Sequence, residues 1–315
     1  MEKSVALVLS SGGARGLAQI GVIQELEKQG FNITSVAGTS VGSWIGGMYA
    51  MGELDYFTEF VCSLNRMEIL NLMNFTLNTH GVITTERAFR KMEKEIPDVL
   101  IEDLRIPYVA MATDLINRKE VAFTSGSLYK AIRASIAIPA VITSVQECDR
   151  VLVDGGVLNP LPIKQVYRNS GDILIAVNLY GMDDNISEKQ KSLNGSVFNG
   201  TLQNIPDEIT TTGSKKTTLS SNGNKQSLNY ISIVKEMVGL VLQSNVENAI
   251  DMYKPEITIH IPWNSAKSFD FHKSHELIEK GRIEARKSLE LYVENSIIPQ
   301  FESQPTRAKP QVTYN

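Results

Sequence analysis

Histidine, cysteine and surplus positive charge are all scarce in this 315-residue chain, and each shortage excludes a class of function. Two cysteines, Cys62 and Cys148, cannot build a disulfide framework or a zinc site of cysteines alone, and 4 histidines leave little for other metal centres. With 31 Lys and Arg against 35 Asp and Glu, the net charge is −4, so the chain lacks the excess of positive charge that is typical of proteins that bind nucleic acid. We therefore expect no metal, no cofactor and no nucleic-acid partner.

Long apolar runs are also missing. The run from Val5 to Leu9 is too short for the core of a signal peptide. No stretch approaches the roughly 18 consecutive apolar residues of a membrane span. These features predict a soluble, cytoplasmic protein. Because the charges nearly balance, we expect any contact with the inner membrane face to be peripheral, apolar and transient.

What the chain does contain is an alternation of strand and helix patterns. Short buried-type strands are predicted at 5–10, 33–37, 107–113, 120–124, 151–153, 173–177 and 257–261. Helices are predicted at 17–29, 41–50, 56–64, 85–94, 128–135, 228–253 and 274–296. The rhythm predicts an α/β fold, a three-layer α/β/α sandwich with a mostly parallel central sheet.

The chain divides by composition into four parts. We expect a catalytic core at 4–182, a polar insertion at 183–227, a C-terminal part at 228–298 that completes the same domain, and a frayed tail at 299–315. The insertion is rich in Ser, Thr, Asn, Gly and Lys, so it buries too little apolar surface to offset the entropy of ordering, and we expect it to be mobile. The helix at 228–253 has no basic stripe, which favours a core or lid role over membrane contact.

A glycine-rich loop follows the first predicted strand, with the sequence Ser-Gly-Gly-Ala-Arg-Gly at 11–16. Glycines allow bare backbone to approach a ligand, and the N-terminus of the following helix favours negative charge. The loop therefore suits an anion, either a phosphate or the oxyanion of a transition state, unless it is merely a tight turn. A dinucleotide site is disfavoured, because Ser11 replaces the first glycine and no acidic residue follows the second strand.

Two further motifs carry nucleophilic chemistry. Gly38-Thr39-Ser40-Val41-Gly42 lies between a strand and a helix, the context of a nucleophile elbow. Asp154-Gly155-Gly156 directly follows a buried strand, where α/β sheets place their sites. Capping of a helix or turn by Ser40 or Asp154 is the plainer interpretation of each motif alone.

A serine nucleophile needs a base, and two arrangements stay open. One is a triad of Ser40, Asp154 and a histidine among His260, His272 and His275, in the chain order of α/β-hydrolases. The other is a Ser–Asp dyad in which Asp154 takes the proton directly. The histidines lie within a strand pattern or beside a helix start, which favours structural or surface roles for them and hence the dyad.

With these motifs in this order, the sequence resembles the patatin-like phospholipase family, in particular its small bacterial members, over roughly Val5 to Leu179. The segment 133–139 and the run Asn-Pro-Leu-Pro at 159–162 fit as well. The resemblance implies hydrolysis of an acyl ester of a lipid, with Ser40 as nucleophile and Asp154 as general base. It also implies an oxyanion hole from the backbone of Gly12, Gly13, Ala14 and Arg15, supported by the motif glycines Gly16, Gly38, Gly42, Gly155 and Gly156.

The resemblance has one departure, and two other functions stay open. The family's loop more often begins with three glycines, and Ser11 stands at the first of these positions. Arg15 can contact a substrate group or pin the loop through an ion pair. The alternatives are a general serine carboxylesterase with a histidine-containing triad, and a non-catalytic regulatory protein on the same fold.

Overall fold

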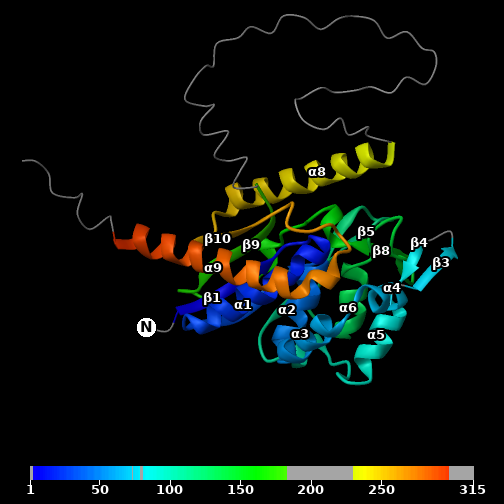
Figure 1. Cartoon of the computed structure of the whole chain (residues 1–315), viewed down its shortest axis with the longest axis horizontal. Coiled ribbons are helices and arrows are strands. Elements are labelled where there is room, and N and C mark those ends of the chain that lie inside the picture. Colours follow the sequence, from blue (N-terminus) through cyan, green and yellow to red (C-terminus); the bar gives the residue numbers. More distant parts are fainter. Residues whose placement is uncertain (1–2, 73, 79–80, 183–229, 298–315) are drawn as a thin grey trace, which may run out of the picture.

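The computed structural model describes residues 3–72, 74–78, 81–182 and 230–297 (Figure 1). The polar insertion and the tail that the composition predicts fall outside these residues. None of the described helices combines the length and the apolar character that a membrane crossing requires.

A mixed sheet of 8 strands forms the centre of the protein, in the order β10-β9-β1-β2-β5-β8-β7, with β6 also paired to β5. Neighbours from β10 to β5 run parallel, whereas β6 and β8 pair with β5 in the antiparallel sense, as β7 does with β8. The strands are β1 (Lys3–Leu9), β2 (Phe31–Thr39), β5 (Tyr108–Asp114), β6 (Lys119–Phe123), β7 (Val145–Glu147), β8 (Arg150–Asp154), β9 (Ile173–Gly181) and β10 (Ile257–Pro262).

Helices cover both faces of this sheet. The α-helices are α1 (Ala18–Lys28), α2 (Val41–Met51), α3 (Leu54–Ser63), α4 (Arg66–Leu72), α5 (Glu86–Glu93), α6 (Leu128–Ser135), α8 (Tyr230–Tyr253) and α9 (Ser274–Ile297). Short 3-10 turns are η1 (Gly13–Leu17), η2 (Ile101–Asp103), η3 (Gly155–Val157), η4 (Ile163–Gln165) and η5 (Phe271–Lys273), and a small hairpin joins β3 (Asn74–Asn78) to β4 (Gly81–Thr84).

The central strand β1 shows how the sequence creates the layers. Because side chains alternate along a strand, Val5, Leu7 and Leu9 enter the core beneath α1, α2 and α9. Ala6 and Val8 point to the opposite face, where they join the smaller core cluster that includes Val246 of α8. Figure 1 shows α8 alone on one side of the sheet and α1 and α9 together on the other.

The expected three-layer α/β/α architecture is thus confirmed, and each predicted strand and helix is present within a few residues of its predicted bounds. The first predicted helix starts as a 3-10 turn at Gly13, and β9 extends to Gly181. The patterns did not predict α4, the β3–β4 hairpin or β7, all of which are short.

Helices α1 and α9 approach each other closely where each carries a glycine. A methyl group at Gly21 would lie 1.8 Å from the carbonyl oxygen of Ile278, and one at Gly281 would lie 1.8 Å from that of Ala18. Beside this crossing, Arg286 donates two hydrogen bonds of 3.1 Å to the carboxylate of Glu25, which is 2% exposed. Since α1 continues directly from η1, this packing fixes the glycine-rich loop to the body of the domain.

We predict that Gly281→Ala lowers the free energy of unfolding by about 1–3 kcal/mol, because the new methyl group has no room against α1. The matched control is Gly239→Ala in α8, where a methyl group meets nothing within 4 Å. The free energy of unfolding of that control should rise by up to about 1 kcal/mol, because alanine has a higher helix propensity than glycine. Denaturant unfolding of both variants measures the difference, and a gain in both would contradict the close crossing.

Candidate active site

Strand β5 brings the serine and aspartate motifs together. Thr39, the last residue of β2, is paired with Met111, and Asp154, the last residue of β8, is paired with the neighbouring Ala112. Because β2 and β8 flank the same stretch of β5, Ser40, which follows Thr39, lies beside Asp154. The Ser40 Oγ donates a hydrogen bond of 2.6 Å to the Asp154 Oδ2. Residues that are distant in sequence thus form one side-chain pair.

The Asp154 carboxylate is buried and well oriented. It is 6% exposed, and its Oδ1 accepts a hydrogen bond of 2.7 Å from the backbone N–H of Gly156. Burial raises the pKa of Asp154 to about 6, while the hydrogen bonds from Ser40 and Gly156 act in the opposite direction. A carboxyl group with this pKa is mostly ionised at neutral pH and still basic enough to accept a proton.

Ser40 lies in a strained turn between β2 and α2. Its φ is 56° and its ψ is −125°, a conformation that costs an L-residue of order 1–3 kcal/mol. The glycines on either side permit this turn, because a larger residue would not fit the close contacts there. A methyl group at Gly38 would lie 2.3 Å from the Gly42 carbonyl oxygen. A methyl group at Gly42 would lie 2.4 Å from the Leu9 carbonyl oxygen. The elbow is therefore pressed against the end of β1, where the glycine-rich loop begins.

The glycine-rich loop lies next to this elbow. A methyl group at Gly16 would lie 2.2 Å from the side chain of Val41, the residue after Ser40. Gly13 has a φ of 59°, in the left-handed region that glycine favours. Within the described residues, the N–H groups of Gly12 and Gly13 make no hydrogen bond, whereas the N–H of Ala14 donates to the Ser268 carbonyl at 2.9 Å. Ala14 is thereby removed from the expected donors.

Arg15 holds this loop in place. Its Nε donates to the Gly12 carbonyl at 3.2 Å, and its Nη1 donates to the Trp263 carbonyl at 2.6 Å. Its guanidinium also lies 5.2 Å from the centre of the Tyr180 ring. Of the two roles that the sequence left open, the structure shows the pinning role, through carbonyl groups and a ring instead of an ion pair.

These motifs all lie within a segment that known proteins share. Residues 7–167 match the family model described as patatin-like phospholipase. The chain belongs to the patatin-like phospholipase family. The matched segment contains the glycine-rich loop, Ser40 and Asp154, so the resemblance stated from the motifs is confirmed.

Several curated proteins resemble this patatin-like chain. An uncharacterized NTE family protein of Mycobacterium tuberculosis is 45% identical over 179 residues, which cover 57% of this chain and 50% of that protein. Lysophospholipase NTE1 of Saccharomyces cerevisiae is 31% identical over 202 residues, which cover 61% of this chain and 12% of that protein. The alignment therefore spans about half the length of the mycobacterial relative and far less of the yeast one.

Among solved structures, VipD from Legionella pneumophila aligns over 92% of this chain and 67% of its own, with a TM-score of 0.47 and 13% identity.

The departure of this patatin-like loop at Ser11 is accommodated by its surroundings. Ser11 does not adopt a positive φ, so its position does not require glycine. Its N–H donates to the Pro160 carbonyl at 2.8 Å, and its Oγ shares a hydrogen bond of 2.9 Å with the Tyr180 hydroxyl. Burial raises the pKa of Tyr180, which keeps this hydroxyl neutral. No sequence motif includes Tyr180, since nothing marks its position at the end of β9.

Ser135 is a second site residue that no motif singles out. Its Oγ accepts a hydrogen bond of 2.9 Å from the Ser40 N–H and donates one of 2.5 Å to the Met111 carbonyl. The side chain is fully buried. Ser135 therefore links the strained elbow to the strand β5 that lies beneath it. The only sequence signal was the resemblance of the segment 133–139 to the family.

The histidines that a triad would need have other surroundings. His260 on β10 contacts the Asn178 side chain at 3.2 Å. His275 on α9 lines a cavity of about 220 Å³ with Cys62 and Arg282. His272 lies in η5, and no histidine of the described segments hydrogen-bonds Ser40 or Asp154. His80 falls outside the described residues.

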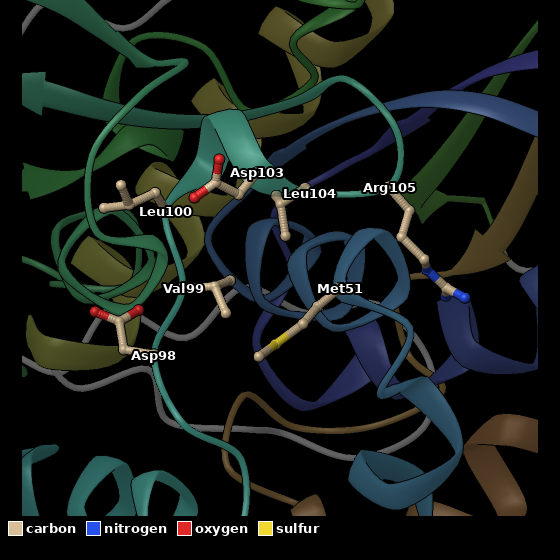
Figure 2. A pocket seen from close by; sticks show the side chains of 7 residues that line it. All are labelled: Met51, Asp98, Val99, Leu100, Asp103, Leu104 and Arg105. Atoms are coloured by element: carbon tan, nitrogen blue, oxygen red, sulfur yellow. The ribbon is translucent and has the colours of Figure 1, made fainter.

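A cavity beside the C-terminal end of α2 is distant from Ser40. It measures about 420 Å³, and among the residues that line it the side chains of Met51, Val99 and Leu104 point toward one another (Figure 2). Met51 ends α2, whereas Ser40 precedes its first residue. An 11-residue helix is about 16 Å long, so the cavity and the Ser40–Asp154 pair lie at opposite ends of α2. The cavity does not belong to this site.

We predict that Ser135→Ala lowers the free energy of unfolding by about 1–3 kcal/mol, because it leaves the buried Ser40 N–H without an acceptor. It should also accelerate hydrogen exchange at the Ser40 amide. The control is Ser127→Ala at the other end of α6, where the serine caps the helix by accepting from the Lys130 N–H at 3.1 Å.

The Ser127→Ala control should lower the free energy of unfolding by about 0.5–2 kcal/mol and leave hydrogen exchange at the Ser40 amide unchanged. Equal acceleration of exchange in both variants would show that Ser135 has no specific role at the elbow. Exchange mass spectrometry of a peptide that contains the elbow measures the difference.

Proposed function

We propose that this protein hydrolyses acyl esters of lipids, with a phospholipid or lysophospholipid as substrate and Ser40 and Asp154 as its catalytic dyad. The observation that carries the proposal is the 2.6 Å hydrogen bond from the Ser40 Oγ to the Asp154 Oδ2 at a strained nucleophile elbow. Membership of the patatin-like phospholipase family supports the lipid substrate. The names of the fungal relatives, which are lysophospholipases, support it as well.

In the first step, the Ser40 Oγ attacks the ester carbonyl carbon while its proton passes to the Asp154 Oδ2. The carbonyl oxygen becomes an oxyanion, and we assign its stabilisation to the N–H groups of Gly12 and Gly13, which have no acceptor within the described residues. The Ser40 N–H is excluded from this role, because it already donates to Ser135. Collapse of the oxyanion breaks the ester bond, and Asp154 returns its proton to the departing alkoxide.

In the second step, water replaces the alcohol. Asp154 removes a proton from this water, whose oxygen attacks the acyl carbon on Ser40. The second oxyanion collapses, the fatty acid leaves, and the proton on Asp154 restores the Ser40 hydroxyl. Two proton transfers to one carboxylate and two returns from it close the cycle, so the mechanism needs no histidine.

A fluorophosphonate probe tests the nucleophile and the base together. We predict that the wild-type protein is labelled at Ser40, that Ser40→Ala is not labelled, and that Asp154→Asn is labelled at least about a hundredfold more slowly, as expected for loss of a general base. Mass spectrometry of the labelled peptide identifies the site.

Substitution of His260, His272 and His275 in turn by Gln should leave the labelling rate nearly unchanged. A loss of orders of magnitude in one of these variants would assign the base to that histidine and support the carboxylesterase triad. A folded wild-type protein that is not labelled would favour the non-catalytic regulatory alternative.

The pH dependence follows from the pKa of Asp154. Because Asp154 must be ionised to accept the proton and its pKa is raised to about 6, kcat/KM should rise about tenfold per pH unit below 6 and reach a plateau above it. A soluble short-chain ester serves as substrate. The residual activity of Asp154→Asn should show no inflection near this pH, and a wild-type inflection near 4 would contradict a buried base.

A further inference from the structure

The loop at 263–270, which joins β10 to η5, exposes two aromatic side chains. Trp263 is 45% exposed and Phe269 is 40% exposed, and Lys267 between them is exposed as well. Two partly exposed aromatic rings in one short loop form a local apolar surface, and exposed apolar surface of this kind can mark an interaction site.

The loop is well ordered by its own hydrogen bonds. The Trp263 N–H donates to the Gly181 carbonyl at 2.9 Å, and the Ser265 Oγ donates to the Pro262 carbonyl at 2.7 Å. The Asp270 N–H donates to the Lys267 carbonyl at 3.1 Å. Ala266, in the middle of the loop, is buried in the main core. Exposure of the two rings is therefore a property of a fixed loop.

The same loop is bonded to the candidate oxyanion loop through its backbone alone. The Ser268 carbonyl accepts from the Ala14 N–H at 2.9 Å, and the Trp263 carbonyl accepts from Arg15 at 2.6 Å. A methyl group at Gly13 would lie 2.7 Å from the Ser268 carbonyl oxygen. The aromatic side chains are thus held beside the catalytic machinery and are free for another contact.

Other exposed apolar residues adjoin residues of the site in the sequence. Met182 is 52% exposed and follows Gly181, the hydrogen-bond partner of Trp263. Val157 and Leu158, which are 39% and 42% exposed, follow the Asp154-Gly155-Gly156 motif directly. Exposed apolar side chains therefore flank both the oxyanion loop and the aspartate motif.

We propose that the 263–270 loop docks this protein on the surface of a lipid bilayer, with Trp263 and Phe269 inserted at the interface and Lys267 toward the lipid phosphates. The proposal rests on the proposed function, because a bilayer is where the substrate of a lipid hydrolase resides. Tryptophan and lysine are both suited to the interface, since each combines an apolar body with a polar end.

The charge of the loop indicates which force dominates. Lys267 is accompanied by Asp270, and Lys273 lies 4.0 Å from the Asp270 carboxylate, so the net positive charge is small. Docking should therefore depend on burial of the aromatic rings and only weakly on anionic lipid or salt. Neutral phosphatidylcholine vesicles are accordingly the probe of choice.

Vesicle sedimentation of the full chain tests the docking. The double variant Trp263→Ala/Phe269→Ala should bind phosphatidylcholine vesicles at least about tenfold more weakly than wild type, since the apolar surface that the bilayer would bury is removed. The control Tyr167→Ala removes an aromatic residue of 56% exposure near the opposite end of β9 and should bind normally.

A second control addresses another exposed apolar surface, on α8. Met237 and Leu240 are 61% and 65% exposed, so the variant Met237→Ser/Leu240→Ser asks whether this helix binds the bilayer instead. Loss of vesicle binding in the α8 variant, with normal binding in the loop variant, would overturn the proposal. Self-association that depends on Trp263, without vesicle binding, would assign the loop to a second copy of the chain and also overturn it.

A fluorescence measurement does not depend on a stable loop variant. The chain has two tryptophans, and Trp44 stacks on Phe89, so Trp44→Phe leaves Trp263 as the only tryptophan, which is excited selectively over the tyrosines. Its emission should shift to shorter wavelength with vesicles and be quenched by brominated lipid. Neither change would occur if the loop stayed in water.

A soluble short-chain ester separates docking from catalysis. Turnover of this ester by wild type, without vesicle binding, would overturn the docking proposal and leave the proposed function intact. Vesicle binding that depends on Trp263, in a protein that neither hydrolyses the ester nor reacts with fluorophosphonate, would overturn the proposed function and leave the docking surface intact.

Discussion

The pairing of β5 with both β2 and β8 is the constraint on which the whole site depends. Met111 and Ala112 on this one strand align Thr39 and Asp154, so the hydrogen bond between Ser40 and Asp154 follows from main-chain pairing. The strand also supplies the Met111 carbonyl that anchors Ser135 beneath the elbow. The geometry of the pair is therefore set by a sheet, which is more rigid than a set of loops.

Close backbone contacts complete what the sheet begins. The end of β1 touches the first turn of α2 at Gly42, and η1 touches Val41 through Gly16. Because neither glycine carries a side chain, the candidate oxyanion donors and Ser40 lie close together. At the α1–α9 crossing, Gly21 and Gly281 likewise allow two segments to approach closely, and α1 follows directly on the glycine-rich loop. Small residues thus determine the distances at the candidate site, and its polar side chains carry the proposed chemistry.

Much of this could be predicted from the sequence, because the strands and helices have strong apolar patterns and the motifs lie at their ends. The pattern could not reveal the direction of β8, which runs antiparallel to β5, since burial alone does not distinguish the two senses. A mostly parallel sheet was predicted, and the parallel part extends only from β10 to β5. Asp154 still reaches Ser40, because β8 ends beside the middle of β5.

The roles of Ser135, Tyr180 and Ser268 were not predictable, because each acts through a contact with a segment distant in sequence. Ser135 and Ser268 are ordinary small polar residues, and only the fold shows that they bind the backbone of the site. Arg15 illustrates the same limit, since its charge indicated a partner but not that the partners are carbonyl groups and a ring.

The left-handed backbone of Ser40 has a consequence for how this chain can change. A glycine at this position would adopt the same angles without strain, so the loss of the hydroxyl and the relief of backbone strain coincide in one substitution. The proposed chemistry and a relaxed backbone are therefore opposed at this residue. A descendant that no longer needed the proposed nucleophile would have a conformational reason to lose the serine first and keep the rest of the fold.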